Sequence, residues 1–372
     1  MYLHAFRSAS GGACIAQEKT LEWLSLQYAK HSGTNIEVAQ RRIARFACSP
    51  SSVSQRRTFL PEWMDGKPPQ VAKHRDIGQR MSIYRQQMAI ALESVLSADA
   101  LTSFPTHLLH VTCTGYSAPS IAESWVSRRL GENPSLTPPV VQHVYHMGCY
   151  ASIPALRTAQ GLLAVERNAS IAIAHTEFCT LHLNEEAACP EQWVIQSLFA
   201  DAVVKYEATL APPRGRPSLE LLTTLERIAP DSIDDMTWNL GPRSFQMSLS
   251  RAVPLKLRDC LRPFVNDLLE RAGLPASEVP RMIAAIHPGG PSIIDHVMQS
   301  LNLDESQATH SRKTLYEHGN VSSATLPLLW KNILEQPQTA KARTASPHVL
   351  CLAFGPGLTL AGAVLRQTEA GP

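Results

Sequence analysis

The sequence predicts an α/β protein made of two similar halves. Short apolar segments rich in β-branched residues alternate with longer segments of helical spacing. A strand, a turn and a helix follow one another around Cys149, and the same succession recurs around His287. Between them, residues 211–217 are rich in Pro, Gly and Arg, which is typical of a linker. We therefore expect an N-terminal half at 1–211 and a C-terminal half at 212–372.

Composition excludes several classes of protein. The chain has 372 residues and is 44% hydrophobic, which is enough for two cores. Lys and Arg total 34 against 32 acidic residues, so no strong field attracts nucleic acid or an anionic membrane. No stretch approaches the ~18 apolar residues of a membrane span. Eight cysteines without a C-x-x-C pair favour reduced thiols over disulfides or zinc. We expect a soluble, cytoplasmic protein with no nucleic-acid partner, no membrane span and no metal.

In the N-terminal half, apolar residues at spacings of three and four predict helices, whereas short branched runs predict strands. The expected helices are 19–31, 35–47, 78–96, the segment from 151 on, and 191–202. The expected strands are 108–112, 140–147, 169–175 and 203–209. The strand 169–175 consists of small and branched residues, so we expect it to be buried. Ligands gather at the carboxyl ends of such strands.

Cys149 lies where the strand that begins at Val140 gives way to a helix. A thiol at this corner faces the free N–H groups and the positive end of the helix, which lowers a pKa that starts near ~8.5. This favours a nucleophilic thiolate. The alternative is a small core residue, because free cysteine is among the most buried residue types.

The C-terminal half carries two further motifs. We expect a helix at 255–273, a strand at 282–286, a helix at 292–301 and a strand pair at 349–354 and 358–365. His287 ends the strand and precedes Pro-Gly-Gly-Pro, which fixes its backbone, and Asn320 lies between Gly319 and the start of a helix. Each position suits a catalytic group. Each also has a simpler explanation: a histidine near a turn, and an asparagine that caps a helix.

Taken together, the motifs and their order resemble the type III polyketide synthases, the chalcone and stilbene synthase-like branch of the thiolase-fold ketosynthases, in a bacterial-type form. The resemblance runs from Thr112 to the C-terminus. The motifs that carry it are Gly148-Cys149-Tyr150-Ala151, Pro154-Ala155-Leu156-Arg157, Leu198-Phe199-Ala200-Asp201, His287-Pro288-Gly289-Gly290-Pro291, Gly319-Asn320-Val321-Ser322-Ser323 and Phe354-Gly355-Pro356-Gly357-Leu358-Thr359. The resemblance implies a thiolase-like layered αβαβα fold of two pseudo-duplicated halves, and a homodimer.

The resemblance also implies a catalytic triad of Cys149, His287 and Asn320. Cys149 takes the starter acyl group from an acyl-CoA as a thioester. Malonyl-CoA then loses carbon dioxide, and His287 and Asn320 donate hydrogen bonds to the enolate. Repeated Claisen condensation lengthens the chain, which cyclises to a pyrone, a resorcinol or a related ring. Malonyl-CoA and acyl-CoA are substrates, and no cofactor is implied.

Further roles follow from the same resemblance. Phe199 is the gatekeeper between the coenzyme A tunnel and the cavity. Cys113, Ala118, Cys179 and His182 fall at positions that line the substrate cavity, and the small Ala118 suggests room for a long acyl starter; ordinary buried packing is the alternative for these residues. Arg56 and Arg57 resemble the basic residues that meet the coenzyme A phosphates.

The chain departs from the family pattern in two places. Asp201-Ala202 stands where Asp-Gly is common, and Leu360-Ala361 stands where a branched residue and Glu are frequent. The first hundred or so residues match only in helical pattern. Three other functions stay open: a carrier-protein-dependent ketosynthase, a ketosynthase that stops after one condensation, and a silent thiolase-fold subunit that scaffolds a partner.

Overall fold

The computed structural model describes residues 1–64, 75–97, 104–184, 189–250, 252–336 and 346–370. The helices in these residues are α1 (Gln17–Ser32), α2 (Ile36–Phe46), α3 (Pro61–Met64), α4 (Ile77–Leu96), α5 (Ile121–Glu132), α6 (Ser152–Val165), α7 (Pro190–Leu198), α8 (Val253–Arg271), α9 (Pro291–Leu301), α10 (Thr309–His318) and α11 (Thr325–Glu335). The strands are β1 (Tyr2–Ser8), β2 (Ala13–Ala16), β3 (Gln55–Thr58), β4 (His107–Thr112), β5 (Val140–Tyr145), β6 (Ile171–Phe178), β7 (Asp201–Thr209), β8 (Ser218–Ile228), β9 (Met236–Leu240), β10 (Phe245–Leu249), β11 (Ile283–Ile286), β12 (His348–Gly355) and β13 (Thr359–Thr368).

Nine of these strands form one sheet in the order β11-β12-β13-β8-β1-β7-β6-β4-β5. β4 pairs in parallel with both β5 and β6, and β11 pairs in parallel with β12. The remaining pairs in this sheet are antiparallel. Strand β1 lies at the centre, where it pairs with β7 on one side and with β8 on the other. The strands of the N-terminal part of the chain therefore join those from β8 onward through the pairing of β1 with β8.

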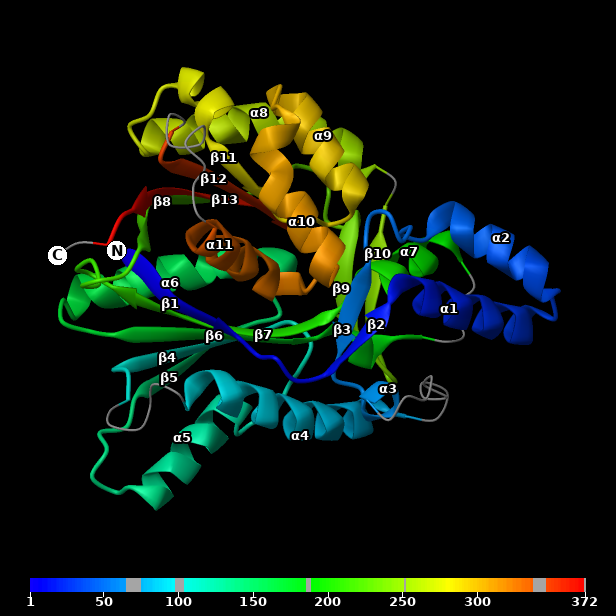
Figure 1. Cartoon of the computed structure of the whole chain (residues 1–372), viewed down its shortest axis with the longest axis horizontal. Helices are drawn as coiled ribbons and strands as arrows, with labels where there is room; N and C mark the ends of the chain where they lie inside the picture. Colours follow the sequence, from blue (N-terminus) through cyan, green and yellow to red (C-terminus); the bar gives the residue numbers. More distant parts are fainter. Residues whose placement is uncertain (65–74, 98–103, 185–188, 251, 337–345, 371–372) are drawn as a thin grey trace.

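The elements are arranged in five layers (Figure 1). Helices α8 and α9 cover the part of the sheet formed by β8 and β11 to β13, and α4 and α5 cover the part formed by β1 and β4 to β7. Helices α6 and α11 lie between the two parts. This is the layered αβαβα arrangement expected from the sequence, with one helical layer shared by both halves.

The middle layer is the main core of the molecule. Helix α6 packs small residues such as Ala155 and Ala159 against strands of both halves, and α11 contributes the fully buried Trp330. Small side chains on α6 let the two parts of the sheet approach the same helix, since interiors are packed without voids. Catalytic elements from either half can therefore meet near the start of this helix.

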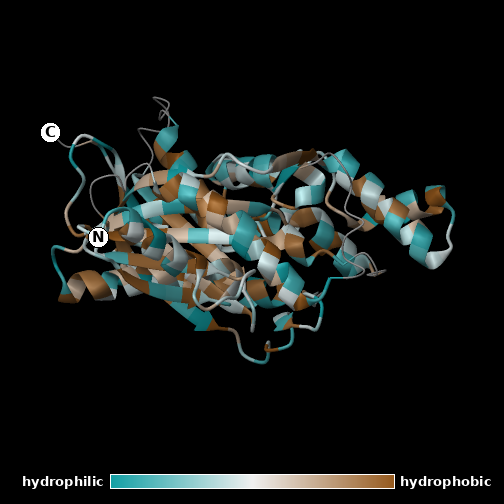
Figure 2. Ribbon diagram, turned by 90° about the horizontal axis from the view of Figure 1, so that it is seen from below, coloured by the Kyte–Doolittle hydropathy of each residue, from teal (hydrophilic) through white to brown (hydrophobic). Residues whose placement is uncertain are grey.

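The structure confirms the strands and helices that the sequence predicts, with one difference at α7, and it adds elements that were not predicted, among them β1, β8, α5, α10 and the pair β9 and β10. The spacing predicts a helix over 191–202, but α7 ends at Leu198 and Phe199 is extended. Residues 199 and 200 leave the helix because they pair with the backbone of Asn320. Exposed helices alternate hydrophilic and hydrophobic residues along their length (Figure 2). Among the described helices, none combines the length and the apolar character that crossing a membrane needs.

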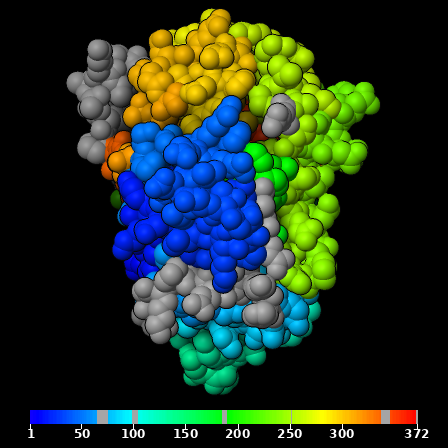
Figure 3. Space-filling view, turned by 90° about the vertical axis from the view of Figure 1, so that its right-hand side faces the viewer, coloured from blue at the N-terminus to red at the C-terminus, as the bar shows by residue number. Residues whose placement is uncertain are grey.

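Segments distant in the sequence meet on the face that Figure 3 shows. The N-terminal residues, with α1 and α2, lie beside the segment around residue 300 and the segment around residue 250. Helix α7 packs against α1 and α2 beneath this face. Residues 211–217 connect β7 to β8, so the proposed division into halves falls in a connection between strands; the boundary stays a prediction.

Candidate active site

Cys149 lies in a short 3-10 turn, Gly148–Tyr150, between β5 and α6. The turn depends on Gly148, whose φ of +77° favours glycine and whose added Cβ would lie 2.4 Å from Pro356 Cδ. Pro356 belongs to the loop between β12 and β13, so the far end of the chain presses on this turn. The predicted strand, turn and helix around the cysteine are confirmed.

His287 follows β11 and is 1% exposed. Its backbone N–H donates to the Leu352 carbonyl at 2.7 Å, and its own carbonyl accepts from Gly289 at 2.9 Å. Neither ring nitrogen has a hydrogen-bond partner in the described part of the chain. Burial lowers the pKa of His287 to about 3, so the imidazole is neutral and keeps one N–H donor and one acceptor.

Asn320 follows Gly319, whose φ is +70°. The Oδ1 atom of Asn320 accepts the backbone N–H of Ser322 at 2.9 Å, which leaves the carboxamide N–H groups as donors. The side chain therefore does cap the turn that follows. A hydrogen bond from this side chain also lowers the pKa of Cys149, so the carboxamide faces the thiol.

The three residues share one cavity of about 930 Å³, which Phe199 also lines. Cys149 further lines a second cavity of about 520 Å³. The two cavities have five lining residues in common: Cys149, Ile195, Phe199, Met236 and Met247. The thiol and the Phe199 ring therefore lie at the boundary between the cavities, as a gatekeeper position requires.

The expectation of a lowered pKa for Cys149 is wrong for the site as the structure describes it. Burial raises the pKa from 9.0 to about 12, although hydrogen bonds from Ser322 and Asn320 act against it and the carboxyl of Glu177 acts with it. This rise corresponds to about 4 kcal/mol. A favourable helix end is worth about 2 kcal/mol at most, so desolvation wins.

Two buried polar residues near the thiol were not anticipated. Ser322 has a φ of +51° and lines the smaller cavity, and it lowers the pKa of both Cys149 and Cys113. Glu177 is fully buried in β6, and burial raises its pKa to about 7. Its carboxyl accepts from Thr114 Oγ1 at 2.9 Å, from the Cys113 backbone and from Ser323 Oγ. A carboxylate at the end of a strand that begins with a buried apolar run was the signal available in the sequence.

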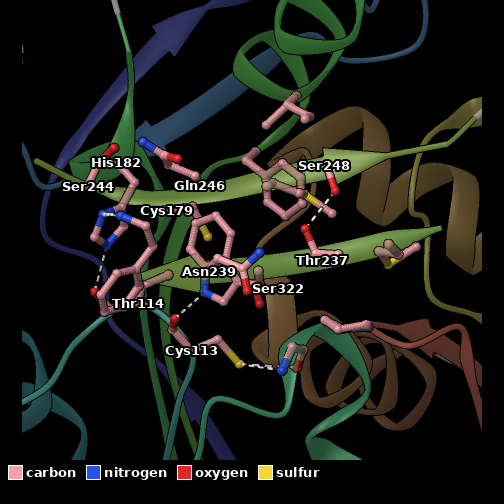
Figure 4. Close-up of a pocket in the computed structure, with 18 of the residues that line it drawn as sticks. Cys113, Thr114, Cys179, His182, Thr237, Asn239, Ser244, Gln246, Ser248 and Ser322 are labelled. Atoms are coloured by element: carbon pink, nitrogen blue, oxygen red, sulfur yellow. Dashed lines mark hydrogen bonds between the residues drawn. The ribbon is translucent and has the colours of Figure 1, made fainter. Parts of the chain in front are cut away.

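The smaller cavity is drawn in Figure 4, with Cys113, Cys179 and His182 in its wall as expected. The His182 Nε2–H donates to the Thr114 carbonyl at 2.8 Å, and its Nδ1 accepts from the Phe245 backbone at 3.1 Å. The ring stacks on Phe245 with centroids 4.5 Å apart. Burial lowers the pKa of His182 to about 3. His182 is thus a fixed, neutral wall residue.

The hairpin of β9 and β10 supplies the rest of this wall, which the sequence did not reveal. Labelled residues of the hairpin point toward the cavity from both strands in Figure 4. Trp238 Nε1 donates to the Cys113 carbonyl at 2.7 Å, which ties the hairpin to the turn after β4. Ala118, which precedes Pro119, is not among the residues that line either cavity. The inference that the small Ala118 leaves room for a long acyl starter therefore has no support within one subunit.

The structure puts Arg56 and Arg57 away from both cavities, contrary to expectation. Arg56 is buried and donates to the carbonyls of Gln196 and Phe199, and Arg57 donates to the carbonyls of Ser10 and Gly11. Both line a separate cavity of about 20 Å³, which is too small for a phosphate. We correct the assignment for Arg56, because a buried guanidinium that is already bonded to backbone carbonyls is not positioned to bind coenzyme A. Arg57 lies nearer the surface, and its guanidinium bonds to carbonyls away from both cavities.

Comparisons with known proteins concern the chain as a whole and its C-terminal part. Residues 220–369 match the family of chalcone and stilbene synthases, C-terminal domain. The chain is 26% identical over 329 residues to type III polyketide synthase A of Arabidopsis thaliana, covering 86% of this chain and 82% of that protein. It is 29% identical over 269 residues to probable polyketide synthase 1 of Dictyostelium discoideum, covering 70% of this chain but only 8% of that protein.

The fold matches a solved structure over its full length. The C-terminal type III polyketide synthase domain of Steely1, a type I/III hybrid from Dictyostelium, has a TM-score of 0.83 and 22% identity, covering 100% of this chain and 99% of that domain. The chain thus has the fold of a type III polyketide synthase domain, residues 220–369 match the C-terminal domain of the chalcone and stilbene synthases, and most of the chain is similar in sequence to type III polyketide synthases.

Proposed function

We propose that the protein loads an acyl-CoA starter on Cys149, decarboxylates malonyl-CoA and performs iterative Claisen condensations that end in cyclisation to a pyrone, a resorcinol or a related ring. One observation carries the proposal. Cys149 lies at the boundary of two cavities, and the larger of them also holds His287 and Asn320. A nucleophile, a proton acceptor and an amide donor thus border a single space that a thioester can enter.

Loading begins from a neutral pair. The pKa of Cys149 is raised to about 12 and that of His287 is lowered to about 3, so thiol and imidazole are both uncharged at neutral pH. As the sulfur attacks the thioester carbonyl, its proton passes to His287, which then gives it to the departing coenzyme A sulfur. The products are an acyl-Cys149 thioester and free coenzyme A.

Decarboxylation uses the donors that remain. Malonyl-CoA releases its carboxylate as carbon dioxide, and the electron pair moves into the thioester carbonyl as an enolate. The N–H of His287 and the carboxamide of Asn320 donate to that oxygen, each donor being worth ~3 kcal/mol in such sites. Asn320 is suited to this because Ser322 already occupies its Oδ1.

Condensation and elongation use both cavities. The enolate carbon attacks the acyl-Cys149 carbonyl, the Cys149 sulfur leaves, and the chain is now a β-ketoacyl-CoA that can reload on Cys149. We assign the growing chain to the cavity of about 520 Å³ and the coenzyme A arm to the cavity of about 930 Å³. The apolar Phe199 between them excludes water from the reacting atoms.

We assign the coenzyme A phosphates to arginines on α2 instead of Arg56 and Arg57. A neighbouring cavity of about 590 Å³ is lined by Arg41, Arg42 and Arg45, and it shares Phe46 and Pro190 with the larger cavity. Guanidinium groups bind phosphate through paired hydrogen bonds. A phosphorylated end that leaves the larger cavity beside Phe46 meets these arginines first.

We also propose a homodimer in a reducing, cytoplasmic compartment. Strand β5 ends the sheet, and Val140 on it is half exposed, as expected for an edge that a second copy covers. All eight cysteines are free thiols. Sedimentation analysis of the purified protein tests the dimer, and a monomer at micromolar concentration would contradict it.

The proposed activity is tested by incubating purified protein with malonyl-CoA and acyl-CoA starters ranging from aromatic to long-chain, with mass spectrometry of the products. Cyclised polyketides support the proposal. A single β-keto product instead indicates one condensation only. Product formed only from carrier-protein thioesters indicates a carrier-dependent ketosynthase. No turnover with any donor contradicts an enzymatic role and favours the scaffold function.

A further inference from the structure

We infer that Arg56 and Gln17 form a buried clamp that positions the gatekeeper Phe199 and the carboxamide of Asn320. Neither residue lines the cavities that hold the proposed chemistry, so both are positioning residues. Both come from the first sixty residues, the part of the chain that least resembles the family. The effect on catalysis rests on the proposed function, whereas the clamp itself is a structural statement.

The clamp closes the C-terminal end of α7. The last carbonyls of a helix have no partner within it, and a buried helix end needs other donors. Arg56 Nη1 donates to the Gln196 carbonyl at 2.9 Å and also to the Phe199 carbonyl. Gln17 Nε2 donates to the Ser197 carbonyl at 2.8 Å. Gln17 Oε1 in turn accepts from Arg56 Nε at 3.1 Å, so the two side chains hold each other.

The remaining carbonyl of this turn, that of Leu198, accepts a hydrogen bond from the backbone of the catalytic asparagine. The Asn320 backbone N–H donates to the Leu198 carbonyl at 2.9 Å, and its own carbonyl accepts from Ala200 at 2.8 Å. Phe199 lies between these two hydrogen bonds. The last turn of α7 is therefore held on one side by the clamp and on the other by Asn320. Any displacement of this turn moves the gate and the amide together.

Arg56 also packs under the backbone that presents Asn320. A Cβ added to Gly319 would lie 2.7 Å from the Leu198 carbonyl oxygen and 3.2 Å from Arg56 Cγ. The stem of the arginine therefore contacts the residue that precedes Asn320, while its guanidinium bonds to the segment that carries Phe199. The Arg56 side chain thus contacts both the backbone before Asn320 and the segment that carries Phe199.

The contacts at position 56 require a side chain that is charged at neutral pH and that donates several hydrogen bonds in different directions. Burial lowers the pKa of Arg56 to about 10, so the guanidinium is still protonated at neutral pH. Its charge faces carbonyl dipoles at the negative end of α7, and the charge of Asp201 favours it further. A lysine presents one ammonium on a flexible stem and cannot reproduce the fork that reaches Gln17 and two carbonyls.

Cys149 is supported separately, which makes the inference testable. Its turn is held by the contact of Gly148 with Pro356 and by hydrogen bonds between Gly148 and Cys113, and none of these involves Arg56 or Gln17. Loosening the clamp should therefore impair decarboxylation more than acyl loading, because the Asn320 carboxamide binds the enolate directly and only assists the ionisation of Cys149. A loss of folded protein would lower both in proportion.

The experiment compares Arg56→Met with Arg56→Lys and with Arg80→Met. Arg80 is a matched control: it is also buried and donates to two carbonyls, those of Leu181 and Leu183. Four quantities are measured for the full chain: the thermal midpoint, amide hydrogen exchange in peptides that contain Ala200 and Asn320, acyl loading by intact mass, and malonyl-CoA decarboxylation per folded protein. If Arg56→Met does not give soluble protein, Arg56→Lys and Gln17→Leu carry the same test.

We expect Arg56→Met to speed exchange at Ala200 and Asn320 and to slow decarboxylation about 100-fold, the cost of a displacement near 1 Å, while acyl loading falls much less. Arg56→Lys is intermediate. Arg80→Met lowers the thermal midpoint without either effect. The inference is overturned if Arg56→Met shows the same hydrogen exchange and decarboxylation as the wild type. It is also overturned if Arg56→Met and Arg80→Met lose decarboxylation equally. If the wild type decarboxylates nothing, the proposed function fails, and hydrogen exchange still decides the clamp.

Discussion

Burial and hydrogen bonding act in opposite directions on Cys149. Burial raises its pKa, and the side chains of Ser322 and Asn320 lower it by stabilising the thiolate. The resting group is therefore a thiol. Under the proposed function, the nucleophile forms only as the thiol proton moves to His287, which burial also keeps neutral at rest.

The first prediction separates loading from decarboxylation. Cys149→Ala removes the acyl acceptor but leaves the N–H of His287 and the carboxamide of Asn320, each worth ~3 kcal/mol to an enolate. We expect no acyl adduct by intact mass and no condensation product, with malonyl-CoA decarboxylation still measurable above the rate without enzyme. Asn320→Ala is the complementary variant, which keeps the acyl acceptor and still forms the adduct but decarboxylates about 100-fold more slowly. Condensation by Cys149→Ala at the wild-type rate would mean that another residue carries the acyl chain.

Glu177 links pH to the stability of the site. Its pKa is 4.5 in an unfolded chain and about 7 in the folded protein because burial disfavours the carboxylate. Below pH 4.5 both states hold the proton. Between pH 4.5 and about 7 the folded state binds more protons than the unfolded state, so stability falls as pH rises. Above about pH 7 the free energy of unfolding has fallen by the full contribution of Glu177, about 3 kcal/mol.

The second prediction follows from this sign. Glu177→Gln cannot ionise, so its stability relative to the wild type should improve by about 3 kcal/mol between pH 4.5 and pH 8. The hydrogen bonds lost in the amide are the same at both values of pH and cancel in the comparison. Urea unfolding of both proteins at each pH measures the difference. An unchanged difference between the two proteins would show that Glu177 does not titrate in this range.

At the scale of elements, the turn between β5 and α6 is shaped by a distant loop. Gly148 contacts Pro356, and a Cβ added to Gly355 would lie 2.3 Å from the ring of Tyr150. The Gly-Cys-Tyr motif (148–150) and the Gly-Pro-Gly motif (355–357) therefore pack directly against each other. Their glycines are needed for close approach as well as for backbone conformation.

The third prediction concerns this contact. Gly148→Ala forces a Cβ to within 2.4 Å of Pro356 Cδ at a φ of +77°, so the turn must shift and carry Cys149 with it. We expect acyl loading to fall about 100-fold, as for a displacement near 1 Å. Gly161→Ala is the control, since it lies within α6 with nothing near its Cβ, and it should stabilise the protein by about 0.5–1 kcal/mol. Loading rates and thermal midpoints of both variants decide the matter.

At the scale of the whole molecule, the two halves share one core. Strand β1 pairs with β7 of its own half and with β8 of the other, and α6 and α11 pack between strands of both. Separating the halves would expose the apolar faces of the middle layer. The halves are therefore similar in plan but are not independent in stability.

The fourth prediction follows. The chain is long enough for two domains, but neither half keeps its core without the other. Calorimetry of the intact protein should therefore show a single unfolding transition, in which both halves unfold together. Tryptophan fluorescence should change at the same temperature, since Trp125 lies in one half and Trp330 in the other. Two resolved transitions would contradict a shared core and support autonomous halves.

The sequence by itself predicted the strands and helices around Cys149 and His287, because periodicity reports which face of a segment is buried and the strand, turn and helix signals there are local. The resemblance of short motifs pointed to Cys149, His287, Asn320 and Phe199, which the structure brings to one cavity, and to the cavity-wall residues Cys113, Cys179 and His182. These features depend on neighbours in the chain.

Tertiary structure alone decided the rest. The pKa of Cys149 depends on desolvation by residues from both halves, which no local rule contains. The end of α7 depends on pairing with Asn320, more than a hundred residues away in the chain. Arg56 and Arg57 are neighbours in sequence, yet one is buried against α7 and the other bonds near the surface, because successive residues of a strand point to opposite faces. Burial and pairing between distant segments assign these roles, and they exist only once the chain has folded.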